Sequence, residues 1–439
     1  MGTIAATLEK AGVPVFVIQN DRYEDRMMAG VQQAGYPDIA RYMANENLEY
    51  TAEGGKKLAS IVYPLIVDGL TKWQPPYLKQ SGNYWVPTAD TFTYSGATYD
   101  EALSKFNAAF LNDMYWGDGL PLTPPTREKV DAMLAATPMT PSLVLAKWGG
   151  PNAEFTVEKV AINAVMAGAK PQYFPVILAA MQSLVSVPWQ NQTWVVRSPT
   201  PLIIVSGPVA QQLKVNSGAD VLGANPKYPA NTSIARAVHL SMINIGAAGR
   251  GLTPSHLIGT AGGLGALVMA EAEDIEALMG KGWEPLNVQL GKPAGENDVT
   301  VIGVSNLALD ISSNITNTAH FIDPDSAYWP STTEAFQKRT VGIMVITELW
   351  GAISSGLIPD PRSTIKIHTP TKADMSKFLY EQARIPRSEF NALFLTNPDG
   401  TPKAATGSMA DLLKTLKDTD AVPVAAGPSN FLVLVSGGH

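Results

Sequence analysis

Short apolar runs rich in β-branched residues recur along the chain and predict buried strands. Residues 201–205, for example, read PLIIV and lack the polar alternation of a strand that has one face in water. A continuous apolar run is typical of a parallel sheet that is covered on both faces. Six strands are expected in this way: residues 13–18, 39–43, 201–205, 299–304, 364–368 and 431–435.

Between these runs, apolar residues recur at helical spacing. The strongest such helix is residues 155–168, whose apolar face is formed by Val157, Val160, Ala161, Ala164 and Val165. Further helices are expected at residues 22–34, 53–70, 127–135, 173–184 and 371–383. Strands that alternate with helices predict an α/β fold with mostly parallel sheets flanked by helices.

The composition of successive segments predicts two linked lobes. Residues 1–73 form a small α/β lobe in this prediction, and residues 112–439 form a larger α/β lobe. Residues 74–111 are aromatic and rich in turn-forming residues, which is typical of a linker. Because ligand pockets favour domain interfaces, we expect the functional site between the lobes.

The segment around which the chain is organised runs from residue 230 to residue 285. It begins with a helix that Asn231 or Thr232 can cap. A glycine-rich segment at residues 246–265 follows, and glycine lets a backbone approach a neighbour closely. This segment contains His256 and leads to two carboxylates. It is therefore either a functional site or a tightly packed helix–loop–helix with its acids in water.

The two carboxylates, Glu271 and Glu273, are two positions apart. On a strand this spacing places both side chains on one face, whereas on a helix it separates them by about 200°. If residues 267–270 form a strand, Glu271, Glu273 and His256 are candidate catalytic residues. They would act as an acid–base pair in which one group has a higher pKa than the other, or as ligands of a divalent metal. A divalent metal is the one cofactor that we expect here. The alternative is one amphipathic helix over residues 269–280 with solvated acids.

Five other residues are candidates for substrate binding. Arg236 lies on the helix before the glycine-rich segment, and its fixed donors suit a substrate carboxylate held by two hydrogen bonds. Asn216 and Ser217 lie in the loop that leads toward this helix. Asn20 and Asp21 follow a predicted strand at the end where ligands bind in open α/β sheets. A cap for the next helix explains Asn20 and Asp21 equally well.

The helix at residues 155–168 carries two further candidate catalytic residues. We expect Glu158 and Lys159 at the edge of a pocket, with Asn163 buried and hydrogen-bonded. Glu158 and Asn163 are separated by about 140° around the helix, so their side chains cannot point at one spot. The alternative is that Glu158 and Lys159 are solvated surface residues.

Composition argues against several classes of protein. The chain has 439 residues, a formal net charge of −7 and no basic cluster, so we expect no nucleic-acid partner. It shows no apolar run of transmembrane length and no signal peptide, so we expect no membrane partner and a cytoplasmic location. The chain contains no cysteine, which removes disulfides, thiolate metal ligands and thiol nucleophiles.

Common catalytic motifs are missing from the sequence as well. It contains no phosphate loop, no dinucleotide-binding glycine fingerprint and no GxSxG element. Its five histidines lie far apart, so a metal site would have to be assembled from distant segments.

Several segments, taken in their order, resemble one family. DGLPLTPPT and FTVEKVAINAVMAGAKPQYFPVILAA resemble its second domain, and PLIIVSGPVAQQL, NSGAD, ANTSIARA and GWEPL are similar to its later landmarks. TIAATLEKAGVPVFVI resembles the segment that follows its selenocysteine or cysteine motif. The chain thus resembles the UGSC-type proteins, which are related to the substrate-activating subunit of glycine-reductase-like selenoenzymes.

The resemblance implies an enzyme subunit that acts on a small polar metabolite and cleaves a carbon–heteroatom bond, in a lyase or reductase-like reaction. The chain lacks the family's Sec/Cys-Gly-Ser-Cys element, and Ala235 stands where relatives carry glycine. Because a selenolate or thiolate is the nucleophile in that family, the thiol step cannot take place on this polypeptide alone.

Three hypotheses follow from this departure. In the first, the chain works in a homo- or hetero-oligomer, and a Cys- or Sec-bearing partner subunit supplies the missing motif. In the second, the chain is a thiol-free hydratase or lyase that uses a metal or acid–base groups. In the third, it is a non-catalytic subunit that binds a small molecule or acts as a scaffold.

Overall fold

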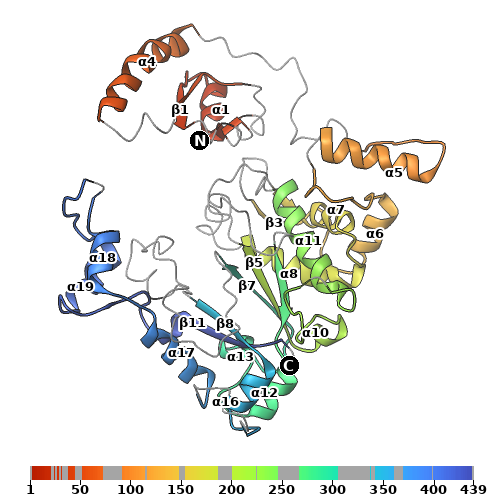
Figure 1. Ribbon diagram of the computed structural model, residues 1–439. Helices are drawn as coiled ribbons and strands as arrows, with labels where there is room; N and C mark the ends of the chain where they lie inside the picture. The colour runs from red at the N-terminus through yellow and green to blue at the C-terminus, as the bar shows by residue number, and fades with distance from the viewer. Residues whose placement is uncertain are drawn as a thin grey trace. The chain divides into compact units, whose positions relative to one another are not determined.

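The structure is a computed structural model of the chain, and most of the sequence is described in it (Figure 1). The described residues are 2–20, 24, 27–28, 31, 38–44, 52–72, 91–113, 116–147, 154–185, 200–223, 225–245, 266–304, 337, 342–359, 369–397 and 399–437. The predicted strand at residues 364–368 lies outside them. The fold is mixed α/β, roughly half helical, with several small sheets of which some are parallel.

The chain divides into two compact units. The first unit comprises Met1–Ile203, Ala224–Val268 and Val299–Ser305. The second unit comprises Ile204–Gly223, Met269–Asp298 and Asn306–His439. The predicted lobes at residues 1–73 and 112–439 stay a prediction.

The first unit begins with a small parallel sheet and its helices. Its elements are α1 (Gly2–Lys10), β1 (Val17–Asn20), β2 (Arg41–Ala44) and α4 (Ala52–Thr71). β1 and β2 are parallel, with Val17 opposite Arg41. β1 begins later than predicted, because Pro14 has no N–H and the Val15 N–H donates to the Glu9 carboxylate at 2.6 Å.

The rest of the first unit is mainly helical, with α7 at its centre. Its elements are α5 (Tyr99–Ala108), the π-helical turn η2 (Ala109–Asp113), α6 (Arg127–Leu134), β3 (Val144–Lys147), β4 (Glu154–Thr156), α7 (Val157–Met166), η3 (Pro171–Tyr173), α8 (Phe174–Val185) and α11 (Pro229–Asn244). α7 packs against α6, α8 and α11 (Figure 1). All five residues of its predicted apolar face are buried, which confirms that prediction. β3 and β4 are antiparallel, unlike β1 and β2.

α5 lies within residues 74–111, where Thr98 caps it by accepting the Glu101 N–H, and the linker at these residues stays a prediction. One prediction about this part needs correction. α11 begins at Pro229, before the predicted cap residues Asn231 and Thr232, since proline suits the first turn of a helix. The Asn231 side chain instead donates to the Val268 carbonyl at 2.6 Å.

The largest sheet has the strand order β6-β5-β7, with β5 (Thr200–Ser206) between β6 (Leu267–Ala270) and β7 (Asp298–Val304). All seven residues of β5 are buried, as its continuous apolar run predicted. The same holds for all four residues of β6.

The second unit adds two small sheets and a set of short helices. β8 (Gly342–Ile346) and β11 (Phe431–Val435) are parallel, whereas β9 (Arg384–Ile385) and β10 (Val422–Pro423) are antiparallel. The helices are α10 (Pro208–Gln212), α12 (Glu273–Met279), α13 (Leu286–Gln289), α16 (Glu348–Ser354), α17 (Lys372–Gln382), α18 (Arg387–Phe394), α19 (Gly407–Lys414) and η5 (Pro428–Asn430). Their apolar core includes the fully buried Trp283, Met375 and Phe390. None of the helices in the described part of the chain is long and apolar enough to cross a membrane.

Candidate functional site

The ends of β5 and β6 meet in the second unit. Gly207 directly follows β5, and Glu273 begins α12 shortly after β6. The Gly207 N–H donates to Glu273 Oε1 at 2.7 Å. Because these strands are neighbours, the bond places both of their carboxyl ends at one edge of the sheet. Ligands of open α/β sheets bind outside such carboxyl ends.

The loop that contains Asn216 and Ser217 joins this edge. The Ala270 N–H donates to the Asn216 carbonyl at 2.9 Å, and the Gly437 N–H donates to the Ser217 carbonyl at 2.8 Å. The buried Asn216 side chain shapes the loop itself, since it accepts from the Gly218 N–H and donates to the Ala219 carbonyl. The backbone thus brings two predicted binding residues beside the end of β6.

The carboxyl ends of β8 and β11 reach the same place. The Ser436 hydroxyl donates to the Ala270 carbonyl at 2.9 Å, and the Ser436 N–H donates to the Ile346 carbonyl at the end of β8. The Ala272 N–H donates to the Val435 carbonyl at 2.8 Å. Four strand ends and one loop therefore converge around residues 270–273, which we call the convergence segment.

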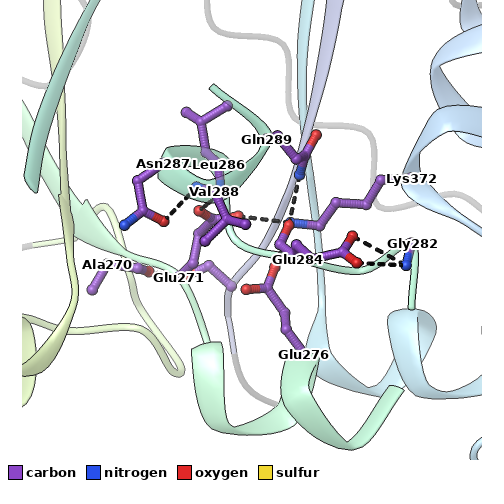
Figure 2. Close-up of polar contacts among 11 residues, drawn as sticks. Ala270, Glu271, Glu276, Gly282, Glu284, Leu286, Asn287, Val288, Gln289 and Lys372 are labelled. Carbon is purple, nitrogen blue, oxygen red and sulfur yellow. Dashed lines mark hydrogen bonds and ion pairs between the residues drawn. The ribbon is translucent and has the colours of Figure 1, made fainter. Parts of the chain in front are cut away.

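A buried ion cluster includes Glu271 of the convergence segment (Figure 2). Lys372 Nζ from α17 is 2.9 Å from Glu271 Oε1 and 2.5 Å from Glu276 Oε1, and it donates to the Glu284 carbonyl at 3.0 Å. The other oxygen of Glu271 accepts the Leu286 N–H at 2.7 Å. The side chains of Glu271, Glu276 and Lys372 are at most 2% exposed.

Two carboxyl groups around this segment have raised pKa values. Burial, with the nearby Glu271 carboxylate, raises the pKa of Glu276 to about 9, although Lys372 acts in the opposite direction. Burial also raises the pKa of the partly exposed Glu273, and the Gly207 N–H partly opposes this change. Glu273 is thus an accessible acid whose pKa is shifted toward neutrality.

The two alternatives for Glu271 and Glu273 are each correct for one part of the segment. Residues 267–270 form a strand and residues 273–279 a helix. The Glu271 side chain is buried and pairs with Lys372, which also pairs with Glu276. Glu273 is partly exposed. Sequence reasoning missed Glu276 and Lys372, and no spacing signal links Glu271 to a lysine 101 positions away.

The metal site expected from His256, Glu271 and Glu273 stays a prediction. His256 lies outside the described residues. Among the described residues no group of three His, Asp or Glu side chains is arranged to hold a metal ion. The Lys372 ammonium lies beside Glu271 where a divalent cation was expected.

Arg236, in the first unit, holds a carboxylate of the chain itself. Its Nε and Nη2 donate to the two oxygens of Asp118 at 2.7 and 2.9 Å, and Nη2 also donates to the carbonyls of Leu120 and Pro121. The predicted geometry of two hydrogen bonds to a carboxylate therefore occurs, but with Asp118 instead of a substrate. This ion pair ties α11 to the loop before α6.

The other predicted residues of the first unit are placed as follows. Glu158 accepts from Arg127 Nη1 at 2.6 Å, and Lys159 Nζ donates to the Glu154 carbonyl at 3.1 Å. Asn163 is buried and accepts from the Asn244 side chain at 2.7 Å, which confirms its prediction.

The remaining pair lies at the end of β1. Asn20 was predicted to follow the strand, but it is the last residue of β1 and pairs with Ala44. Asp21 lies outside the described residues.

Comparisons with known proteins add no further assignment. No family model matches the sequence, and neither a curated protein nor a solved structure is significantly similar to it. The resemblance to the UGSC-type proteins stays a prediction from the ordered sequence segments.

Proposed function

We propose that the chain is an enzyme subunit that acts on a small polar metabolite by acid–base chemistry, making or breaking a carbon–heteroatom bond. Glu273 is the acid–base residue in this proposal. The observation that carries it is the position of Glu273, which is partly exposed at the shared end of β5 and β6 with one oxygen held by the Gly207 N–H.

The environment of Glu273 suits proton transfer. A general acid or base works best when its pKa lies near the operating pH, and burial shifts the pKa of Glu273 in that direction. The bond from Gly207 fixes the orientation of the carboxyl group. The neighbouring Ser206 hydroxyl is buried, has no hydrogen-bond partner among the described residues, and offers a further polar group at this edge.

The absence of cysteine from the sequence favours a reaction without a thiol on this chain. Addition or elimination of water or ammonia needs only a group that moves a proton and groups that orient the substrate. The substrate class that fits is therefore a small hydroxy or amino compound.

The test compares Glu273→Gln with the wild-type chain and with Glu128→Gln, which changes an exposed glutamate on α6. Each purified chain is incubated in D2O with a panel of small hydroxy and amino acids, and NMR follows product and solvent-deuterium incorporation. We expect turnover by the wild type and by Glu128→Gln, and a loss of about 100-fold or more in Glu273→Gln. Equal rates for all three chains would rule out Glu273.

The same assay separates the other two hypotheses. Turnover that begins only after a thiol- or selenol-bearing protein is added would favour a split enzyme over acid–base chemistry on this chain. Saturable binding without turnover under both conditions would favour a non-catalytic binding subunit.

A further inference from the structure

The buried ion cluster has an uneven distribution of hydrogen bonds. Both oxygens of Glu271 accept one, from Lys372 and from the Leu286 N–H. Among the described residues neither oxygen of the buried Glu276 makes a hydrogen bond of ordinary geometry, although Oε1 lies 2.5 Å from the Lys372 ammonium. Glu271 therefore has the environment of an ionised carboxylate, and Glu276 does not.

A count of charges leads to the same assignment. Two ionised carboxylates and one ammonium would leave one negative charge uncompensated in a site that excludes water. A buried charge without a partner is strongly unfavourable, and a buried acid avoids this cost by binding a proton. One proton on Glu276 makes the cluster neutral while the Glu271–Lys372 pair stays intact.

The surrounding elements bring other charged residues to this region. They are Glu273 and Asp274 of α12, Lys281 and Glu284 of the following segment, Glu348 of α16, and Lys372, Asp374, Lys377 and Glu381 of α17. The Glu284 carboxylate accepts the Gly282 N–H (Figure 2). Glu271 and Lys372 are the charged groups that act most strongly on Glu276.

We propose that Glu276 is a buried proton-binding site that latches α12 to α17 and to the segment before α13, and that alkaline loss of the proton opens this latch. Once ionised, Glu276 competes with Glu271 for Lys372 and repels it. The contacts that depend on the Glu271–Lys372 pair, including the Leu286 N–H bond, then weaken. The proposal is independent of any reaction at Glu273.

The sign of the pH dependence follows from the direction of the shift. The pKa of Glu276 is raised in the folded protein, so the folded state binds a proton that the unfolded state releases above its ordinary pKa. The stabilisation is fully present below that ordinary value and is lost as the pH rises toward about 9.

The first experiment detects the proton in the full chain by infrared spectroscopy. Wild type and the control Glu128→Gln should show the band of a protonated carboxyl group at pH 7, and titration to pH 10 should remove it. Glu276→Gln should lack this component. A wild-type spectrum without a protonated carboxyl band at pH 7, or one unchanged in Glu276→Gln, would overturn the proposal.

The second experiment measures the latch by hydrogen exchange at pH 7 to 9, corrected for the intrinsic rates. The reporters are the amides of Leu286 and Lys372, which donate to Glu271 and to the Gly282 carbonyl. Relative to Glu276→Gln, wild-type protection should fall on the order of tenfold per pH unit until the pH reaches the Glu276 pKa of about 9. Parallel profiles for wild type and Glu276→Gln would contradict the latch, and the wild-type infrared titration remains decisive if the variant does not fold.

Discussion

Gly207 lies where a single added methyl group would meet the backbone of another segment. Its φ of +83° is in the left-handed region, and a Cβ would lie 2.4 Å from the Glu296 carbonyl oxygen. The chain can therefore turn from β5 into α10 and present its N–H to Glu273 only with glycine at this position.

We expect Gly207→Ala to lower the free energy of unfolding by about 1–3 kcal/mol, because positive φ and the close contact both penalise alanine. Gly291→Ala is the matched control, since Gly291 has a φ of +88° but nothing within 4 Å of its Cβ position. Urea unfolding of both variants measures the difference. A smaller loss for Gly207→Ala than for Gly291→Ala would show that the Glu296 backbone moves away without cost.

The ionisation of Asp118 makes the stability of the first unit depend on pH in the acid range. Burial acts to raise its pKa, but the hydrogen bonds and charge of Arg236 outweigh burial, so the pKa lies below its ordinary value of 3.8. The stability contributed by this pair is present above that ordinary value and is lost as the pH falls through the lower, folded pKa.

Asp118→Asn should therefore lower the protection of α11 amides at pH 7 by about 1–3 kcal/mol, because a charged hydrogen-bonded pair loses one partner. Wild type and variant should converge only as the pH falls through the lowered pKa of Asp118, below 3.8. Hydrogen exchange across this pH range measures both effects. Asp131→Asn, at an exposed pair with Arg127, should leave the profile unchanged. An equal loss of α11 protection in Asp131→Asn would mean that the effect comes from the change in net charge and not from the Asp118–Arg236 pair.

At the scale of elements, helix starts differ in how they are capped. The Thr371 hydroxyl accepts the Asp374 N–H at 3.1 Å at the start of α17, whereas Thr406 at the start of α19 makes no side-chain cap bond. α17 also carries Lys372 in its first position. Its start is thus fixed by a local bond next to the buried ion cluster.

Thr371→Ala should cost about 1 kcal/mol of stability, as expected for loss of an N-cap, and Thr406→Ala should cost far less. Thermal unfolding of the two variants provides the measurement. Equal shifts in Tm would mean that the cap bond of the Thr371 hydroxyl adds no stability to what the change from threonine to alanine causes at an uncapped helix start.

The same elements show what periodicity and apolar runs can predict. The runs at β5 and β11 and the apolar face of α7 follow from local sequence, because burial on both faces or on one stripe leaves a direct pattern. The late start of β1 does not, since it depends on the Glu9 side chain taking the Val15 N–H. The start of α11 was misplaced because Asn231 resembles a cap but bonds to Val268.

At the scale of the whole chain, the candidate site depends on contacts between distant segments. Glu271, Glu273, Asn216 and Ser217 could be singled out because their residue types are chemically suggestive. Their meeting point could not be predicted, because it depends on backbone bonds such as that from Ala270 to Asn216. The role of Lys372 was equally hidden, as its partner Glu271 is 101 positions away.

The bond from the Ser436 hydroxyl to the Ser217 carbonyl joins residues 219 positions apart, and it has a consequence for biosynthesis. A ribosome makes the loop at Ser217 long before it makes Ser436, so the nascent loop must wait without this partner. Closing so long a loop carries a large entropic penalty and is slow. The convergence segment is therefore among the last parts of the protein to mature, and a chaperone that shields β5 and β6 during translation would act on exposed sheet edges at that stage.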